Sequence, residues 1–245
     1  MITKKTLAII GCEANEKIIN ALSTLGFCVQ ILPRNNLLPT PVSSHADMLM
    51  LVIDDCVFAE KQYIIDANGV FDVIASYGYR VIPCDIALGN EYPNDIAFNI
   101  AICNNVLYGN VKHNATEIIE FAKAKNFKIN SVKQGYTKCS TVVLGNSGII
   151  TADNGIANAA EGNGLMVLKI SNSPDSVALE GYNYGFIGGA CGVLGRSVYF
   201  SGNIDLHTNS EAIKGFCESL GFDIISLTDS ALVDIGGIIF LPFYS

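Results

Sequence analysis

The segment GGACGVLGRSVYFSGN (188–203) contains the pattern that decides the fold. A glycine pair precedes an apolar run, a turn at Gly195-Arg196 follows, and a second apolar run ends at another glycine. Short runs of β-branched and aromatic residues joined by a glycine-containing turn are typical of a β-hairpin. A phosphate-binding glycine loop is followed by a helix instead, so we interpret this segment as a strand-turn-strand unit.

This hairpin unit recurs along the chain. Each copy has an apolar inner strand, a turn of Asp, Asn or Gly, and a second strand. The other copies are DMLMLVIDDCVFAE (47–60), DIAFNIAICNNVLYGN (95–110), CSTVVLGNSGIITAD (139–153) and DIGGIIFLPFYS (234–245), the last with one strand only. The inner strands are apolar almost throughout, which predicts burial on both faces.

A second unit, a helical stretch that ends at Gly or Asn before a short strand, occurs five times. Gly and Asn accept the left-handed conformation that ends many helices. The five anchor residues are spaced by 38 to 57 residues, about one fifth of the chain each: Gly26, Gly78, Asn126, Gly164 and Gly221. The strand 6–11 and the helix 15–25 supply what the fifth module lacks. The N-terminal strand is therefore predicted to complete the last module and close a ring.

Two helix starts are predicted from capping boxes, NATE (114–117) and TNSE (208–211). Each follows a histidine, His113 or His207, at the same place in its module. This equivalence favours a structural or surface role for both histidines over a catalytic one.

Composition bounds the class of protein. Half of the 245 residues are hydrophobic, 16% are charged, the mean hydropathy is +0.37 and the net charge is −8. The 15 basic residues do not cluster, which argues against nucleic acid as a partner. No apolar run reaches the roughly 18 residues of a membrane helix, so no membrane partner is expected. We expect a single domain over residues 1–245.

The cysteines and histidines show no metal-binding pattern. The chain has eight cysteines without a CxxC pair and three histidines that lie far apart. Cysteines in apolar runs act as small buried hydrophobes, and a reduced, cytoplasmic protein is expected. We predict no metal site and no cofactor.

Five modules of strand, hairpin and helix resemble the five-bladed α/β propeller called the pentein fold. The resemblance covers the whole chain as a repeat pattern. The fold is shared by guanidino-group-modifying enzymes, which include arginine and agmatine deiminases, dimethylarginine dimethylaminohydrolases and amidinotransferases, and by a non-enzymatic ribosomal anti-association factor. The resemblance implies an α/β fold and a site for a guanidino or amidino compound. In such enzymes a thiolate attacks the guanidinium carbon, a histidine transfers protons and carboxylates bind the cation.

The C-terminal segment departs from the enzyme pattern. GGIIF (236–240) is similar to the glycine-rich motif of the deiminases, in which glycines precede a His and the nucleophilic Cys. Ile239 and Phe240 occupy those two places. The family's catalytic histidine in a middle module has no match either. The resemblance thus supports the fold more than the activity.

Carboxylates stand at predicted inner-strand starts in three modules, at Asp47, Asp95 and Asp234. If the ring closes, they face one end of its axis and favour a cation there. A guanidinium, amidinium or amine suits such a site. Equally, each Asp could accept backbone N–H bonds at a loop end, and both alternatives stay open.

Cys139 is the candidate nucleophile, because the ammonium of Lys138 beside it can lower the pKa of a thiol. His45 is a candidate base from the adjacent loop. The alternative is a buried structural thiol. Cys191 lies inside an apolar strand and is expected to be inert.

The glycines of 185–192 and 236–237 are predicted to permit close backbone approach near the ring axis. Tyr182, Tyr184 and Phe186 are candidates to line the mouth beside them.

Three functional hypotheses follow. The first is a Cys-dependent amidino hydrolase or transferase. The second is a non-catalytic pentein that binds a small cation or a protein. The third is a doubly wound nucleotide-binding enzyme, suggested by the βαβ-like start at residues 7–32, where one glycine stands in place of the three that a dinucleotide fingerprint needs. The sequence leaves catalysis, substrate and oligomeric state open.

Overall fold

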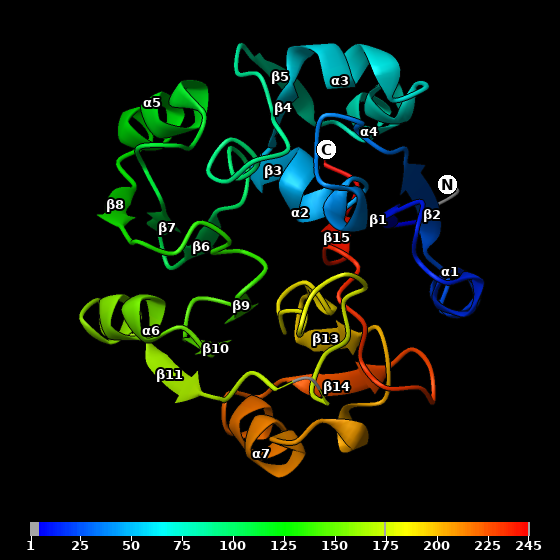
Figure 1. Cartoon of the computed structure of the whole chain (residues 1–245), viewed down its shortest axis with the longest axis vertical. Coiled ribbons are helices and arrows are strands. Elements are labelled where there is room, and N and C mark those ends of the chain that lie inside the picture. The colour runs from blue at the N-terminus through cyan, green and yellow to red at the C-terminus, as the bar shows by residue number, and fades with distance from the viewer. Residues whose placement is uncertain (1–4, 174, 245) are drawn as a thin grey trace.

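A computed structural model describes residues 5–173 and 175–244. In these residues five three-stranded sheets surround a common axis, with helices on the periphery (Figure 1). The predicted five-module α/β propeller is confirmed. The third hypothesis required one open parallel sheet, and this arrangement excludes it.

Each module has an inner, a middle and an outer strand. From inner to outer, the sheets are β3 (Met50–Ile53), β4 (Cys56–Glu60) and β5 (Arg80–Cys84); β6 (Ala101–Cys103), β7 (Val106–Gly109) and β8 (Lys128–Ser131); β9 (Thr141–Leu144), β10 (Gly148–Thr151) and β11 (Met166–Lys169); β12 (Cys191–Leu194), β13 (Ser197–Phe200) and β14 (Asp223–Ser226); and β15 (Ile239–Leu241), β1 (Leu7–Gly11) and β2 (Cys28–Leu32).

Inner and middle strands pair antiparallel, and middle and outer strands pair parallel. A parallel pair needs a crossover, which the peripheral helices provide. They are α1 (Glu16–Thr24), α3 (Lys61–Asp66), α4 (Val70–Ser76), α5 (Thr116–Ala124), α6 (Asn154–Glu161) and α7 (Ser210–Ser219). The short helix α2 (Ala46–Leu49) precedes β3, and 3-10 turns span Thr40–Val42 and Ile204–Leu206.

The two ends of the described chain share one module. Leu7 of β1 pairs antiparallel with Leu241 of β15 and parallel with Cys28 of β2. The prediction that the N-terminal strand completes the last module is confirmed. The βαβ-like start is therefore real, but it belongs to a three-stranded module.

The positions chosen as helix ends and hairpin turns adopt the conformations their residue types favour. All five anchors, from Gly26 to Gly221, have φ between 60° and 94°. After α1 and α7 the chain closes with six-to-one bonds, such as Phe222 N–H to Cys217 O at 2.9 Å. At the β6–β7 turn both Asn104 and Asn105 have positive φ, as a type I′ hairpin requires.

The peripheral helices bury one apolar stripe each against their own sheet. In α1 the buried residues Ile18 and Leu22 are four apart, and in α7 Ile213 and Cys217 repeat that spacing. Residues four apart lie on one helix face, so a helix with this pattern covers a sheet. Successive modules pack against one another through apolar residues that lie between neighbouring sheets.

The two predicted capping boxes are wrong. Helix α5 has Ala115 as its N-cap, while Asn114 donates to the carbonyl of Ile96 and Glu117 accepts from the N–H of Asp85. Helix α7 has Asn209 as its N-cap, without a side-chain capping bond. In both places contacts to other segments compete for the side chains that a capping box would use.

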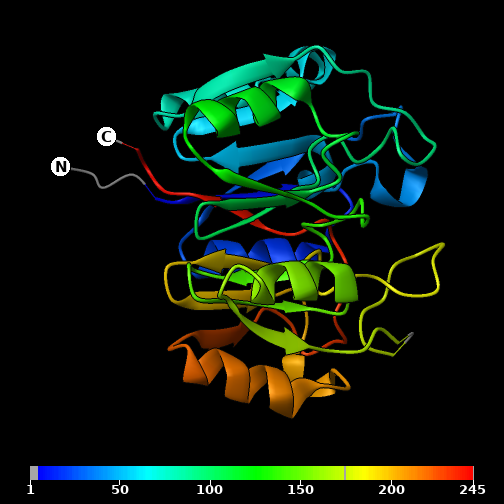
Figure 2. The same cartoon turned by 90° about the vertical axis from the view of Figure 1, so that its left-hand side faces the viewer.

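The long loops that precede the inner strands project from one face of the disc, opposite the side on which the end marked C lies (Figure 2). We call this side the mouth face. Within the described residues no helix is both long and apolar enough to cross a membrane. All eight cysteines lie among the described residues and are free thiols.

Candidate functional site

One helical turn precedes the inner strand in several modules and positions the side chains of the mouth. The N–H of Leu49 bonds the carbonyl of His45, that of Ser140 bonds Tyr136, and that of Ala190 bonds Phe186. Each of these acceptor residues stands eight positions before the last residue of its inner strand, and Asp95 has the same place in the second module. Four modules thus present equivalent residues.

Together with Asp234 of the fifth module, these residues form a chain of contacts from Asp95 to His45, one residue from each module. We call the five residues the mouth ring: His45, Asp95, Tyr136, Phe186 and Asp234. The Tyr136 hydroxyl donates to Asp95 Oδ2 at 2.7 Å, and the Tyr136 and Phe186 ring centroids are 6.2 Å apart. The N–H of Phe186 donates to Asp234 Oδ2 at 2.8 Å. His45 Nδ1 lies 3.7 Å from Asp234 Oδ1.

Asp234 is a buried carboxylate, with 3% of its surface exposed. Its two oxygens accept the N–H groups of Phe186 and Gly236. Burial raises the pKa of Asp234 above its usual 3.8, and the charge of Asp47 adds to the rise, while His45 and the two N–H bonds oppose it. A cation beside this group would favour its charged form.

Cys139 lies under the mouth ring in a buried polar cluster. Its thiol donates to Asp47 Oδ2 at 3.1 Å and accepts from Asn99 Nδ2 at 2.9 Å. Asn99 Oδ1 also accepts the N–H groups of Lys138 and Cys139 at 2.8 and 3.2 Å. Asn99 is completely buried and ties the second module to the third.

The predicted acidic thiol is wrong. Burial raises the pKa of Cys139 well above the usual 9.0, and the charges of Asp47 and Asp234 raise it further. The ammonium of Lys138 is directed to the carbonyl of Gly188, 3.4 Å away, and not to the thiol. Adjacent residues in a helical turn point in different directions, which sequence proximity alone does not reveal. Nothing observed tests whether Cys139 and His45 are catalytic, so those roles stay predictions.

A pocket of about 250 Å³ opens at the mouth face. The predicted mouth aromatics, Tyr182, Tyr184 and Phe186, do line it, together with His45, Tyr136, Cys139, Asn183, Asp234 and apolar residues. We call it the mouth pocket. It brings together three of the six predicted site residues, His45, Cys139 and Asp234.

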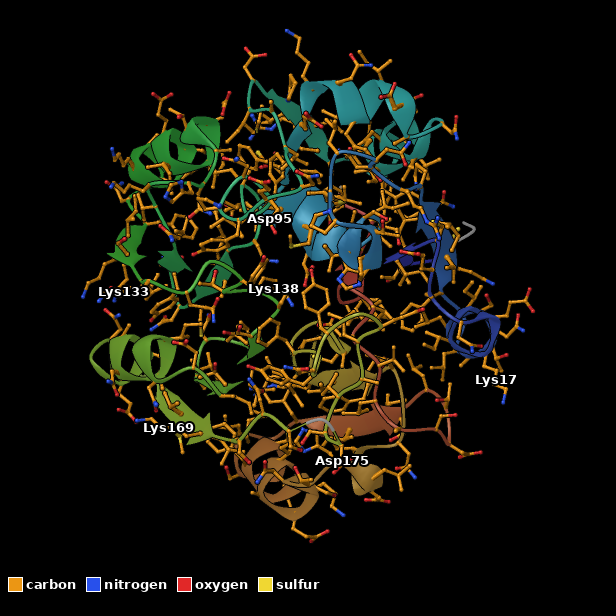
Figure 3. All side chains as sticks on the ribbon, in the orientation of Figure 1. Lys17, Asp95, Lys133, Lys138, Lys169 and Asp175 are labelled. Atoms are coloured by element: carbon orange, nitrogen blue, oxygen red, sulfur yellow. The ribbon has the colours of Figure 1, made fainter. Side chains whose placement is uncertain are left out.

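The other three predicted residues lie around this pocket. Asp95 stands behind its wall, bonded to Tyr136. Asp47 and Lys138 line a second cavity of about 400 Å³ along the axis, toward the hairpin turns. Figure 3 shows Lys138 near the centre of the ring, whereas Lys17, Lys133 and Lys169 lie at its rim.

The second cavity is apolar apart from Asp47, Lys138 and Cys191. Equivalent half-buried residues of four inner strands line it: Val52, Ile102, Val143 and Val193. The prediction of burial on both faces is therefore wrong at these four positions. It is also wrong at Leu194, Ile239 and Phe240, which are only partly buried. Burial raises the pKa of Cys191 to about 12, which agrees with its expected inertness.

Two corrections concern local position. Asp47 lies in α2 and not on a strand, and Asp95 and Asp234 lie several residues before β6 and β15. The apolar pattern of the inner strands continues through the preceding helical turn, so the strands were predicted to start too early.

The mouth glycines permit close approach, as predicted. At Gly236, with φ of 73°, an added Cβ would overlap the side chain and backbone of His45. At Gly189 it would overlap the carboxylate of Asp234. A side chain at either position would push these mouth-ring residues apart.

Two residues that shape the site, Asn99 and Tyr136, are not among the residues predicted from the sequence. Asn99 was read as part of an apolar strand, although a single Asn in IAFNIAIC is itself a signal of a buried polar role. Tyr136, in KQGYTKCS, has no local signal, because its importance comes from Asp95 and Phe186 in neighbouring modules.

The C-terminal strand carries no catalytic pair. Ile239 and Phe240 stand where the resemblance implies a histidine and a cysteine, and the Phe240 ring packs against Phe27 and Tyr199 at centroid distances of 4.8 and 5.0 Å. Within the described residues no group of His, Cys, Asp and Glu could hold a metal ion.

Solved structures with the same architecture share little sequence with this chain. DDAH from Pseudomonas aeruginosa, complexed with citrulline, matches with TM-score 0.58 and 14% identity over 99% of this chain and 100% of that one. The N-terminal domain of ArgZ, an arginine dihydrolase from cyanobacteria, matches with TM-score 0.55 and 10% identity over 99% and 98%. SxtG, an amidinotransferase from Microseira wollei, matches with TM-score 0.55 and 11% identity over 99% and 95%. These likenesses establish the pentein fold.

No curated protein sequence matches the chain. One family model does, over residues 9–239, which is nearly the whole chain. The chain therefore belongs to DUF6873, a family of unknown function, and has the pentein fold.

Proposed function

We propose that the mouth pocket binds a small organic cation, with Asp234 as the counter-charge. The observation that carries the proposal is the buried Asp234 carboxylate in an aromatic-lined pocket. Among the described residues the only basic group within 4 Å of the carboxylate is His45, whose Nδ1 lies 3.7 Å from Asp234 Oδ1. Burial of a charged carboxylate without a close cation raises the free energy of the folded protein. A cationic ligand offsets this destabilisation.

Two further observations support a cation over an anion. The chain carries a net charge of −8, which attracts cations by its overall field. Asp47 lies one layer below the mouth ring, and its Oδ1 has no hydrogen-bond partner among the described residues. The structural neighbours are named as enzymes of arginine, dimethylarginine and amidino transfer, so guanidinium is the first cation to test.

Isothermal titration calorimetry with guanidinium and with urea tests this function. The two have the same shape and differ in charge, so the site is expected to bind guanidinium and not urea. Asp234→Asn should weaken the binding at least about tenfold, because it removes the counter-charge. Asp223→Asn, at an exposed strand position, is the matched control and should change nothing. Equal binding of urea, or normal binding by Asp234→Asn, contradicts the proposal.

A second candidate function is a Cys-dependent amidino hydrolase or transferase. Cys139 and His45 line the same pocket, and the Cys139 thiol already donates to Asp47. In this reaction Asp47 takes the thiol proton and the sulfur adds to the amidino carbon. An amine then leaves with a proton from protonated His45. Water or another amine attacks the carbon and returns a proton to His45, and the sulfur leaves with the proton held by Asp47, which restores the thiol. A cation bound beside the thiol would offset the carboxylates that now raise its pKa.

Chloroacetamidine and chloroacetamide separate the two candidates, since only the first is cationic. Catalysis predicts that chloroacetamidine labels Cys139 much faster than chloroacetamide does, as mapped by mass spectrometry. Uniformly slow labelling of all eight cysteines would exclude the enzyme and leave cation binding intact.

A further inference from the structure

Four tyrosine and phenylalanine residues line the mouth pocket. Phe186 contacts Tyr136 at a ring distance of 6.2 Å and Tyr184 at 5.9 Å, the latter edge to face. Tyr182 and Tyr184 remain 49% and 38% exposed at the lip. We call these four residues the aromatic wall: Tyr136, Tyr182, Tyr184 and Phe186. Aromatic faces attract cations through the ring quadrupole, without hydrogen bonds.

The buried hydrogen-bond acceptors of the pocket already have partners. Both oxygens of Asp234 already accept backbone N–H groups. The Tyr136 hydroxyl is bonded to Asp95, and Cys139 Sγ is held between Asn99 and Asp47. The inner part of the pocket therefore offers negative charge and aromatic surface, whereas Asn183 and the hydroxyls of Tyr182 and Tyr184 provide acceptors at its exposed lip.

These two features distinguish among cations. A guanidinium carries N–H donors on all three of its nitrogens, and donors left unpaired in a buried site weaken binding. A quaternary ammonium has no donor and is attracted by aromatic faces and by a nearby carboxylate charge. Resting on the cation-binding function above, we propose that the mouth pocket selects a trimethylammonium head group, carried by a free small molecule of the choline type.

The size of the pocket supports a small free ligand. Its volume of about 250 Å³ lies just below the roughly 300–1,000 Å³ of sites for drug-sized molecules. Buried Val42, Met48 and Cys139 line its inner part. A compact head group fills such a space, and the lip at Tyr182 and Tyr184 leaves room for a short substituent.

Tyr184 offers a matched pair of variants, because it is partly exposed. Tyr184→Phe keeps the aromatic face and Tyr184→Leu removes it at similar apolar volume. Leu in place of Tyr184 should weaken tetramethylammonium binding roughly fivefold, whereas Phe should preserve it. Phe186→Leu provides a second aromatic deletion, with thermal unfolding as the check on its fold.

The test is calorimetric titration of the full chain with tetramethylammonium, guanidinium and ammonium at one ionic strength. The proposal expects tetramethylammonium to bind at least about tenfold more tightly than guanidinium, and ammonium to bind weakest. Guanidinium binding as tightly as tetramethylammonium would overturn the selectivity while the cation-binding function stands. Absence of binding by all three would overturn both. Identical affinities of Tyr184→Phe and Tyr184→Leu would remove the aromatic wall as the cause.

A second arm separates a free ligand from a membrane head group. Choline in solution should bind with an affinity similar to that of tetramethylammonium, and the protein should not sediment with phosphatidylcholine vesicles. Sedimentation with vesicles in the absence of choline binding would overturn the assignment to a free small molecule.

Discussion

At the scale of single residues, Asp234 is the group on which the site depends. It is buried, accepts two backbone N–H bonds and lies next to His45. Its pKa is raised above 3.8 chiefly by burial, so the folded protein holds the proton more tightly than the unfolded chain does. This contribution to stability therefore declines as pH rises above 3.8 through the raised pKa, and a bound cation reverses the decline.

The first prediction concerns the pH dependence of binding. Cation affinity should be constant near neutral pH and should weaken on acidification, starting at a higher pH than an ordinary carboxyl would allow. Calorimetric titrations across the acidic range measure this profile. In Asp234→Asn the residual affinity should show no such dependence. If the cation affinity of Asp234→Asn still fell on acidification, the titrating group would be another residue.

The second prediction concerns Asn99, which holds Lys138 and Cys139 by their backbone N–H groups. Asn99→Ala leaves two buried donors unpaired and should lower the free energy of unfolding by about 2–5 kcal/mol. Asn146→Ala, at an exposed hairpin turn, is the control and should change stability by less than about 0.5 kcal/mol. Denaturant unfolding measures both, and a small effect at Asn99 would contradict its central place in the cluster.

At the scale of elements, the turn before each inner strand decides the shape of the mouth. These turns bring His45, Tyr136 and Phe186 to equivalent places, and the glycines at 188–189 and 236–237 let the turns approach one another. Three backbone segments meet at these glycines, and they lie too close together to leave room for a Cβ atom.

The third prediction follows at Gly236. Gly236→Ala combines a positive φ with overlap against His45, and should destabilise the fold by about 2–4 kcal/mol and abolish cation binding. Gly215→Ala in α7 is the opposite case, since an added Cβ meets no atom within 4 Å. It should stabilise the protein by up to about 1 kcal/mol. If Gly236→Ala and Gly215→Ala changed the thermal unfolding temperature equally, this account of the mouth would be contradicted.

The same elements show what sequence could predict. Gly26, Gly78 and Gly221 were recognised as helix ends because a left-handed residue is a local requirement, and all have positive φ. The hairpin turns were recognised for the same reason. The capping boxes failed because Asn114 and Glu117 bond to segments far away in sequence. Local rules hold where competition from distant contacts is absent.

In the candidate site, too, the features set by local sequence could be predicted and those set by distant contacts could not. Its carboxylates and Cys139 could be selected from their places in the repeat, but the direction of Lys138 and the bond between Tyr136 and Asp95 could not. Both depend on how neighbouring modules meet, which no single segment encodes. The raised pKa of Cys139 likewise reflects burial and the charges of Asp47 and Asp234, which belong to two other modules.

At the scale of the whole molecule, closure of the ring creates the site. The mouth ring takes one residue from each of the five modules, and Asp234 belongs to the module completed by β1. In that module no turn joins the inner strand to the middle strand. It therefore has the structure of another module whose hairpin turn has been opened.

The fourth prediction tests this equivalence. A permuted chain that joins Tyr244 to Lys5 by a short linker and opens the turn between Asn146 and Ser147 should fold and bind cations like the original. Opening an exposed turn loses few contacts, and Leu7 and Leu241 already lie side by side. Deletion of residues 1–11 should instead abolish cooperative unfolding, because β15 and β2 lose the strand between them. Circular dichroism and thermal unfolding distinguish the outcomes.

The central claim, that a cation is bound next to Asp234, is tested most directly by NMR. The amides of Phe186 and Gly236 donate to the two Asp234 oxygens and report any charge placed beside them. On titration with tetramethylammonium these two amide signals should shift and saturate together, and Asp234→Asn should remove the shift. Saturable shifts confined to other parts of the chain, or no shift at Phe186 and Gly236, would contradict the account.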